Sequence, residues 1–201
     1  MIIETLYVAM YTISTSLLYP VVLSLIVLVV YSLMKIGELI AESAKRRRDF
    51  DTIRKICKTL EFKEALRELN KLNLNRLVKE FIEDLNKINP TKNDIDKLLQ
   101  DYELKVAKEL EIPRILAKIG PMLGLMGTLI PLGPALIALS KGDVELLATN
   151  LITAFATTVL GLIVGGVGYV LSIVKKRWYL QDLSDMEYIA KSLGGVYEEI
   201  H

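Results

Sequence analysis

The chain has 201 residues, of which 52% are apolar and 24% charged, and its formal net charge is +1. A positive mean hydropathy of +0.37 beside so many charges indicates apolar blocks that are separated from charged ones. The near-neutral balance excludes a global electrostatic field directed at nucleic acid. The single cysteine, Cys57, excludes an internal disulfide, and we interpret it as a packing residue in a charged segment.

The first uncharged stretch lies between Glu4 and Lys35, and residues 13–34 within it are apolar enough to cross the bilayer. A helix of this length spans about 30 Å of hydrocarbon. We therefore predict an N-terminal segment and a first transmembrane helix within residues 1–34. A secretory signal peptide is the alternative, but the start has no Lys or Arg and no small-residue cleavage site follows the apolar run.

Two further uncharged stretches lie between Lys118 and Lys141 and between Glu145 and Lys175. Each is long enough to span, and we predict transmembrane helices at 115–139 and 147–174. Only a short outer loop at 140–146 separates them. The two spans must therefore form a tight antiparallel hairpin.

The orientation follows from the Lys and Arg residues near the ends of the spans. Lys35 and the basic run at 45–48 follow the first span, and Lys175, Lys176, Arg177 and Trp178 follow the third, where we interpret them as inner-interface anchors. We therefore expect a multi-pass protein of the inner or plasma membrane, with its N-terminus outside and residues 35–114 and 175–201 in the cytoplasm. The run at 45–48 could contact nucleic acid, but its place beside a span favours a role in topology and anionic-lipid binding.

The cytoplasmic residues carry apolar positions at helical spacing. They are Ile53, Ile56, Leu60, Leu74, Leu77, Val78, Phe81, Ile82, Leu85, Ile95, Leu98, Leu99, Tyr102, Val106 and Leu110. This spacing predicts amphipathic helices whose charged faces meet water. We predict an all-α, polytopic protein with three transmembrane helices extended into a cytoplasmic helical bundle (35–114) and a C-terminal helix and tail (175–201).

Local signals place the boundaries within this region. Thr91 with Asp94 three residues later fits a helix N-cap, and Pro113 predicts a kink or break before the second span. The apolar stripes are sufficient for a bundle core and predict no cleft. We interpret the region as a docking or torque-transmitting surface.

Several chemistries are missing from the sequence. His201, at the end of the chain, is the only histidine, which excludes Ser-His and Cys-His catalysis and argues against a zinc site. No GxxxxGK[ST] phosphate loop occurs. We therefore expect neither enzymatic activity nor a cofactor or metal. The spans contain no Asp, Glu, Lys, Arg or His between their bounding charges, so a carboxylate for ion transfer would have to come from a partner.

Small residues recur every four positions in the second and third spans. They are Gly120, Gly124 and Thr128, then Thr153, Thr157, Gly161 and Gly165. In lipid, helices associate by close backbone approach, which such residues permit. Packing within one chain is one interpretation. Further small residues on other faces of the third span, Ala154, Thr158, Gly166 and Gly168, favour packing between subunits.

Two segments carry a family resemblance. GPMLGLMGTLIP at 120–131 resembles the APLLGLLGTV pattern of ExbB and TolQ, with Pro121, Gly124, Gly127 and Thr128 at matching positions. TAFATTVLGL at 153–162 resembles their EALxATAxGL pattern, with matches at Thr158, Gly161 and Leu162. The chain is thus similar to the MotA/TolQ/ExbB family, closest to ExbB and TolQ, over about residues 110–178.

The resemblance implies a ring-forming subunit of an ion-driven motor. Such rings, usually pentamers, surround a dimer of a single-span ExbD-, TolR- or MotB-like partner whose Asp carries a proton or sodium ion. Thr128 and Thr158, with Thr157 and Thr153 beside them, would line the ion path. Five glycines and one proline would provide the helix packing that holds the oligomer together: Gly120, Pro121, Gly124, Gly127, Gly161 and Gly165.

Two departures and two alternatives stay open. Thr153 replaces a family glutamate, and a proline common in the family is absent near Val167, which leaves the ion path and the ion's identity undecided. Each threonine hydroxyl could instead bond back to its own helix. The ring could also be a non-conducting scaffold that anchors a partner protein.

Overall fold

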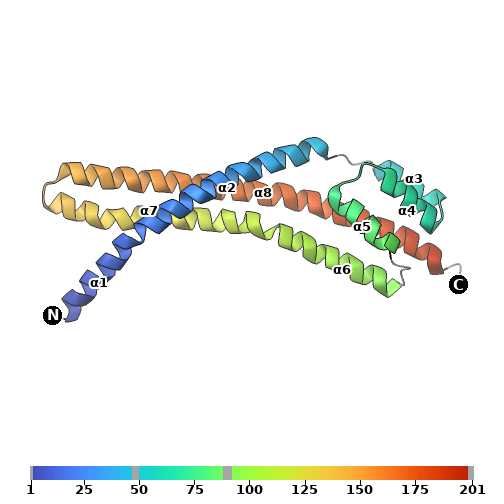
Figure 1. Cartoon of the computed structure of the whole chain (residues 1–201), viewed down its shortest axis with the longest axis horizontal. Coiled ribbons are helices and arrows are strands. Elements are labelled where there is room, and N and C mark those ends of the chain that lie inside the picture. The colour runs from blue at the N-terminus through green and yellow to red at the C-terminus, as the bar shows by residue number, and fades with distance from the viewer. Residues whose placement is uncertain (1, 47–49, 88–91, 199–201) are drawn as a thin grey trace. The chain divides into compact units, whose positions relative to one another are not determined.

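A computed structural model describes residues 2–46, 50–87 and 92–198 (Figure 1). All regular elements in these residues are helices: α1 (Ile2–Ser16), α2 (Leu18–Lys45), α3 (Phe50–Thr59), α4 (Phe62–Lys71), α5 (Arg76–Lys87), α6 (Lys92–Glu109), α7 (Glu111–Ser140) and α8 (Val144–Glu198). Three stretches are long and apolar enough to span a membrane: Ile3–Lys45, Asn93–Ser140 and Val144–Leu193. The all-α class and the presence of three helices long and apolar enough to span are therefore confirmed. The predicted cap at Thr91, Arg47 and Arg48 of the basic run, and His201 lie outside the described residues.

The helices form two compact units. The first combines Met1–Leu39 with Ile112–Ser172, and the second combines Ile40–Glu111 with Ile173–His201. The first unit holds the apolar spans, and the second holds most of the charged helices.

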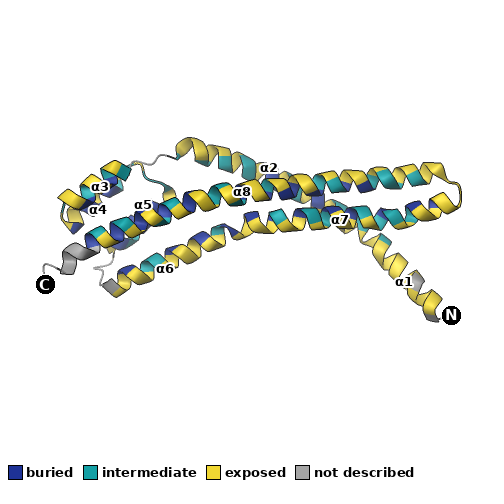
Figure 2. Ribbon diagram, turned by 180° about the vertical axis from the view of Figure 1, so that it is seen from behind, coloured by how far each residue is buried: buried dark blue, intermediate teal, exposed yellow. Residues whose placement is uncertain are grey.

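The first span is not one uninterrupted helix. A turn at Leu17 separates α1 from α2, inside the stretch 13–34 expected to be a single helix. Pro20 explains the break, because it has no N–H to bond to the carbonyl of Ser16 one turn earlier. From α2, Val21, Leu25 and Ser32 are buried, while most other α2 positions in the span remain exposed (Figure 2).

The predicted hairpin of the second and third spans is formed by α7 and α8. At its turn, Gly142 has φ +72°, and the N–H groups of Gly142 and Asp143 bond to Leu139 O (3.1 Å) and Ala138 O (2.9 Å). This Schellman arrangement requires the left-handed conformation that glycine adopts without strain. The Asp143 carboxylate then caps α8 by accepting the Leu146 N–H at 3.0 Å.

Glycines set the distance between α7 and α8. A Cβ added at Gly161 would lie 2.6 Å from both Gly120 O and Gly124 Cα, and one added at Gly120 would lie 2.7 Å from Gly165 N. A Cβ at Gly165 would lie 2.6 Å from Pro121 Cγ. The four-residue stripe is thus used for packing within one chain. At Gly166, by contrast, a Cβ would meet nothing within 4 Å.

The second unit is a helical bundle with one apolar core. Ile53 and Cys57 of α3, four residues of α4, five of α5 and the apolar side of α6 meet Tyr179, Met186, Ile189 and Leu193 of α8 in this core. The predicted apolar positions of α3, α5 and α6 are therefore confirmed as core or core-edge residues. The C-terminal segment, expected as a separate helix and tail, contributes to the same core. The break before the second span lies at Leu110, so Pro113 occupies the first turn of α7, where its missing N–H costs nothing.

Gly161→Ala should destabilise the hairpin by about 1–3 kcal/mol, because the added methyl group forces two backbones apart. Gly166→Ala is the matched control and should change stability little, since its methyl group meets open space. SDS-induced unfolding from mild detergent, followed by circular dichroism, measures both. Equal stability of the two variants would contradict the assigned packing.

Candidate functional site

The candidate ion-path residues Thr128 and Thr158 lie opposite each other in the α7–α8 hairpin. Their hydroxyl groups are hydrogen-bonded to each other, although the residues are 30 positions apart. Both side chains are half-buried. The structure therefore brings together the two threonines that the sequence motifs singled out separately.

Each of these hydroxyls also lies within bonding distance of backbone carbonyls. Thr128 Oγ1 is 2.9 Å from Gly124 O and 3.4 Å from Ala154 O, and Thr158 Oγ1 is 2.9 Å from Ala154 O. A hydroxyl has one proton to donate and can accept two bonds. When one threonine donates to the other, only the second still donates to a carbonyl. The pair thus has several arrangements of its two protons and keeps free acceptor positions.

The other two predicted path residues are placed differently. Thr157 is only 3% exposed and lies in the helix interface, where a Cβ added at Gly127 would be 2.6 Å from its own Cβ. Its hydroxyl donates within α8, to Thr153 O or Ala154 O, each at 3.0 Å. Thr153 is half-buried and donates to Thr149 O at 3.1 Å. The structure does not join either residue to the Thr128–Thr158 pair by a side-chain hydrogen bond.

A buried charge cluster in the second unit was not predicted from the sequence. Arg46, the residue directly after α2, donates to Asp182 Oδ1 of α8 at 2.5 Å and to Trp178 O at 2.8 Å. Asn75, at the N-cap position of α5, donates to the same Asp182 oxygen at 2.9 Å. The side chain of Asp182 is only 2% exposed. Burial raises the pKa of Asp182, and Arg46 opposes that rise. The cluster joins the residues at the end of α2 and at the start of α5 to α8.

The four expected interface anchors divide into two pairs. Trp178 is buried, with the Arg46 guanidinium 5.1 Å from its ring centroid, and the largely buried Lys175 lies 3.8 Å from Glu42. Lys176 and Arg177 are exposed. Residues three apart on a helix share a face, which is why Lys175 and Trp178 turn inward together.

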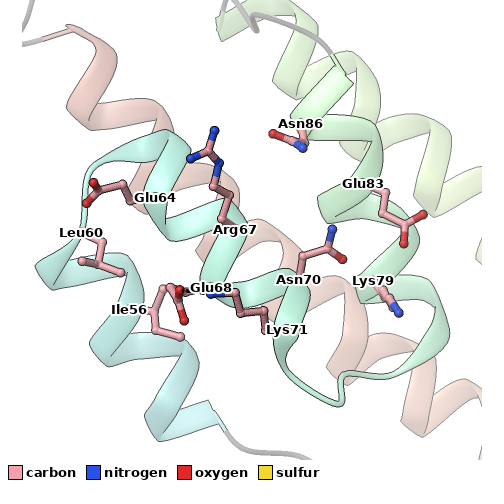
Figure 3. A pocket seen from close by; sticks show the side chains of 10 residues that line it. All are labelled: Ile56, Leu60, Glu64, Arg67, Glu68, Asn70, Lys71, Lys79, Glu83 and Asn86. Carbon is pink, nitrogen blue, oxygen red and sulfur yellow. Dashed lines mark hydrogen bonds and ion pairs between the residues drawn. The ribbon is translucent and has the colours of Figure 1, made fainter.

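An open groove of about 1010 Å³ lies over α3, α4 and α5, where the sequence predicted no cleft (Figure 3). It is lined by Ile56, Leu60, Glu64, Arg67, Glu68, Asn70, Lys71, Lys79, Glu83 and Asn86. The lining has three carboxylates and three cations, so the groove does not favour ligands of either charge. Asn70 Oδ1 is buried without a hydrogen-bond partner, and the groove holds no grouping typical of catalysis.

Arg46→Met should destabilise the protein by about 3–5 kcal/mol at pH 8, because it leaves the Asp182 carboxylate buried without its partner. The pKa of Asp182 is already raised, so its contribution to stability is largest when the group is protonated and is lost as pH rises through the folded-state pKa. The loss caused by Arg46→Met should therefore be smaller at pH 5 than at pH 8. Thermal unfolding in detergent at both pH values tests this. Arg46→Met/Asp182→Asn should recover much of the loss; an equal loss at both pH values without recovery would contradict the assignment.

The comparisons with known proteins agree with this architecture. The model of the MotA/TolQ/ExbB proton channel family matches residues 61–187, which is more than half of the chain and includes both Thr128 and Thr158. Neither a curated protein nor a solved structure matches significantly. With its three apolar helices, the chain is therefore a multi-pass membrane protein that belongs to the MotA/TolQ/ExbB proton channel family.

Proposed function

We propose that this chain is the ring-forming subunit of an ion-driven membrane motor and works with a single-span, ExbD-, TolR- or MotB-like partner. The observation that carries the proposal is the Thr128–Thr158 hydroxyl pair between two apolar helices. Family membership supports a proton-channel role. The ring oligomer, the single-span partner and the coupling of ion flow to mechanical work are proposed in addition to the family's channel role.

The pair fits a carboxyl group supplied from outside the chain. An ionised carboxylate is expensive in a low-dielectric environment, and it accepts hydrogen bonds only. Thr128 and Thr158 can turn their protons from carbonyls or from each other toward such a carboxylate. When the carboxyl group is protonated, it can donate to a free lone pair of either hydroxyl. The pair can therefore bond to both protonation states and so ease proton uptake and release.

The ring is proposed to use surfaces that the hairpin leaves free. The glycine stripe is occupied within the chain, so subunit contacts must come from other positions, including the open face at Gly166. Large apolar side chains such as Phe155 and Leu162 are exposed on the same helix. In a membrane they can contact lipid, a neighbouring subunit or a partner helix. We propose a pentamer in the inner or plasma membrane, with the second unit in the cytoplasm.

Thr158→Val keeps the side-chain shape, deletes the hydroxyl and should reduce ion flux at least tenfold in the complex reconstituted with its partner. Thr149→Val is the matched control, because Thr149 is exposed and donates only within its own helix, to Glu145 O at 2.9 Å. Flux is measured in liposomes with a pH- or sodium-sensitive dye. Wild-type flux and work by Thr158→Val in an intact complex would favour a non-conducting scaffold.

Native mass spectrometry in mild detergent should show a ring, with five copies expected. Gly166→Leu should shift this distribution toward smaller species while the circular dichroism spectrum stays unchanged, because a Cβ added at Gly166 has no neighbour within 4 Å in its own chain. Monomers alone for the wild-type protein, with and without the partner, would count against the ring. A ring unaffected by Gly166→Leu would exclude that face from the interface.

A further inference from the structure

Lys176 and Arg177 form part of an exposed face of α8 that the bundle leaves unused. Four other residues share this face: Ile173, Leu180, Gln181 and Ser184. Spacings of three and four residues place all six side chains on one side of the helix. They border an open depression of about 560 Å³. We call this surface the α8 basic face.

The charge of this face is not balanced by neighbouring acids. Neither Lys176 nor Arg177 has an ion-pair partner among the described residues, and no carboxylate borders the depression. Asp182 and Asp185, the acids nearest in sequence, are buried on the opposite side of α8 at 1% and 2% exposure. Lys175 differs, since it lies near Glu42. Two positive charges are thus available to an anionic ligand.

The face also has a polar and an apolar end. Ile173 is 51% exposed and lies on the side of the uncharged stretch that ends at Lys175, and Leu180 is 54% exposed one turn beyond the cations. Gln181 and Ser184 follow on the side away from the span. A ligand that fits this order has an apolar part, then a negative charge, then polar oxygens. No aromatic ring borders the depression to stack a nucleic-acid base, because Trp178 is buried.

We propose that the α8 basic face binds the headgroup of an anionic phospholipid. Lys176 and Arg177 hold the phosphate, and Arg177 can do so with two parallel N–H groups. Gln181 and Ser184 donate hydrogen bonds to headgroup oxygens, and Ile173 contacts the first methylene groups of an acyl chain. Leu180 lies at the level of the interface. The inference depends on α8 leaving the bilayer at Lys175 and is independent of ion conduction.

The test uses the full-length protein in mild detergent. Phosphatidylglycerol and phosphatidylcholine are titrated separately, and bound lipid is counted by native mass spectrometry. The wild-type protein should prefer phosphatidylglycerol, and Lys176→Gln/Arg177→Gln should weaken that binding about tenfold to thirtyfold, since each cation near an anionic surface contributes on the order of fivefold. Equal binding of the two lipids by the wild-type protein would overturn the proposal.

The control is Arg54→Gln/Lys55→Gln, which removes the same two residue types from an exposed position on α3. It should bind phosphatidylglycerol like the wild-type protein, and an equal loss in both variants would reduce the effect to net charge and overturn the site. Soluble glycerol phosphate forms a second arm and should bind far more weakly than the lipid. Equal affinity for the two would mean that Ile173 and the acyl chain play no part, which would overturn the lipid assignment in favour of a phosphate site. Circular dichroism confirms that each variant is folded.

Discussion

The close backbone approach of α7 and α8 is the constraint on which the candidate site depends. Lipid supplies no hydrophobic force that would join two apolar helices, so their contact comes from surface complementarity. Gly120, Gly124 and Gly161 provide it, because none has a side chain to hold the helices apart. Thr128 lies one turn beyond Gly124, and Thr158 lies three residues before Gly161. At this helix separation the two hydroxyls are hydrogen-bonded to each other. Bulkier residues at the glycine positions would increase the separation of the helices and break this contact.

The close approach of α7 and α8 also determines which hydroxyls remain accessible to a further helix packed against the hairpin. Thr157 faces Gly127 and is buried, so its side chain fills space in the hairpin and bonds to its own helix. Thr128 and Thr158 lie at the edge of the contact and keep part of their surface. Every hydroxyl in the hairpin core has a partner without any acid. A carboxyl group placed here would therefore exchange existing hydrogen bonds for new ones.

Much of this architecture could be predicted from the sequence because it follows from local periodicity. Uncharged length located the three spans, and helical spacing identified α3, α5 and α6. The break at Leu17 was missed although Pro20 offered a signal. The Arg46–Asp182 pair could not be found, because 136 residues separate its members and Asp182 lies among ordinary polar neighbours. The ion-path role expected for Thr128 and Thr158 comes from a resemblance, and the structure adds only that their hydroxyls are hydrogen-bonded to each other.

The basic residues near the spans differ in how far the folded chain compensates their charge. Arg46 and Lys175 both count toward an inside-positive orientation, yet one is paired with buried Asp182 and the other lies near Glu42. A lipid headgroup responds to the field outside the protein, where these two charges are largely compensated. Lys176 and Arg177 keep their full charge at the surface, although they are adjacent in sequence to Lys175. Helical phase, which separates 175 and 178 from 176 and 177, therefore determines which of these residues pack against the bundle and which cations stay exposed.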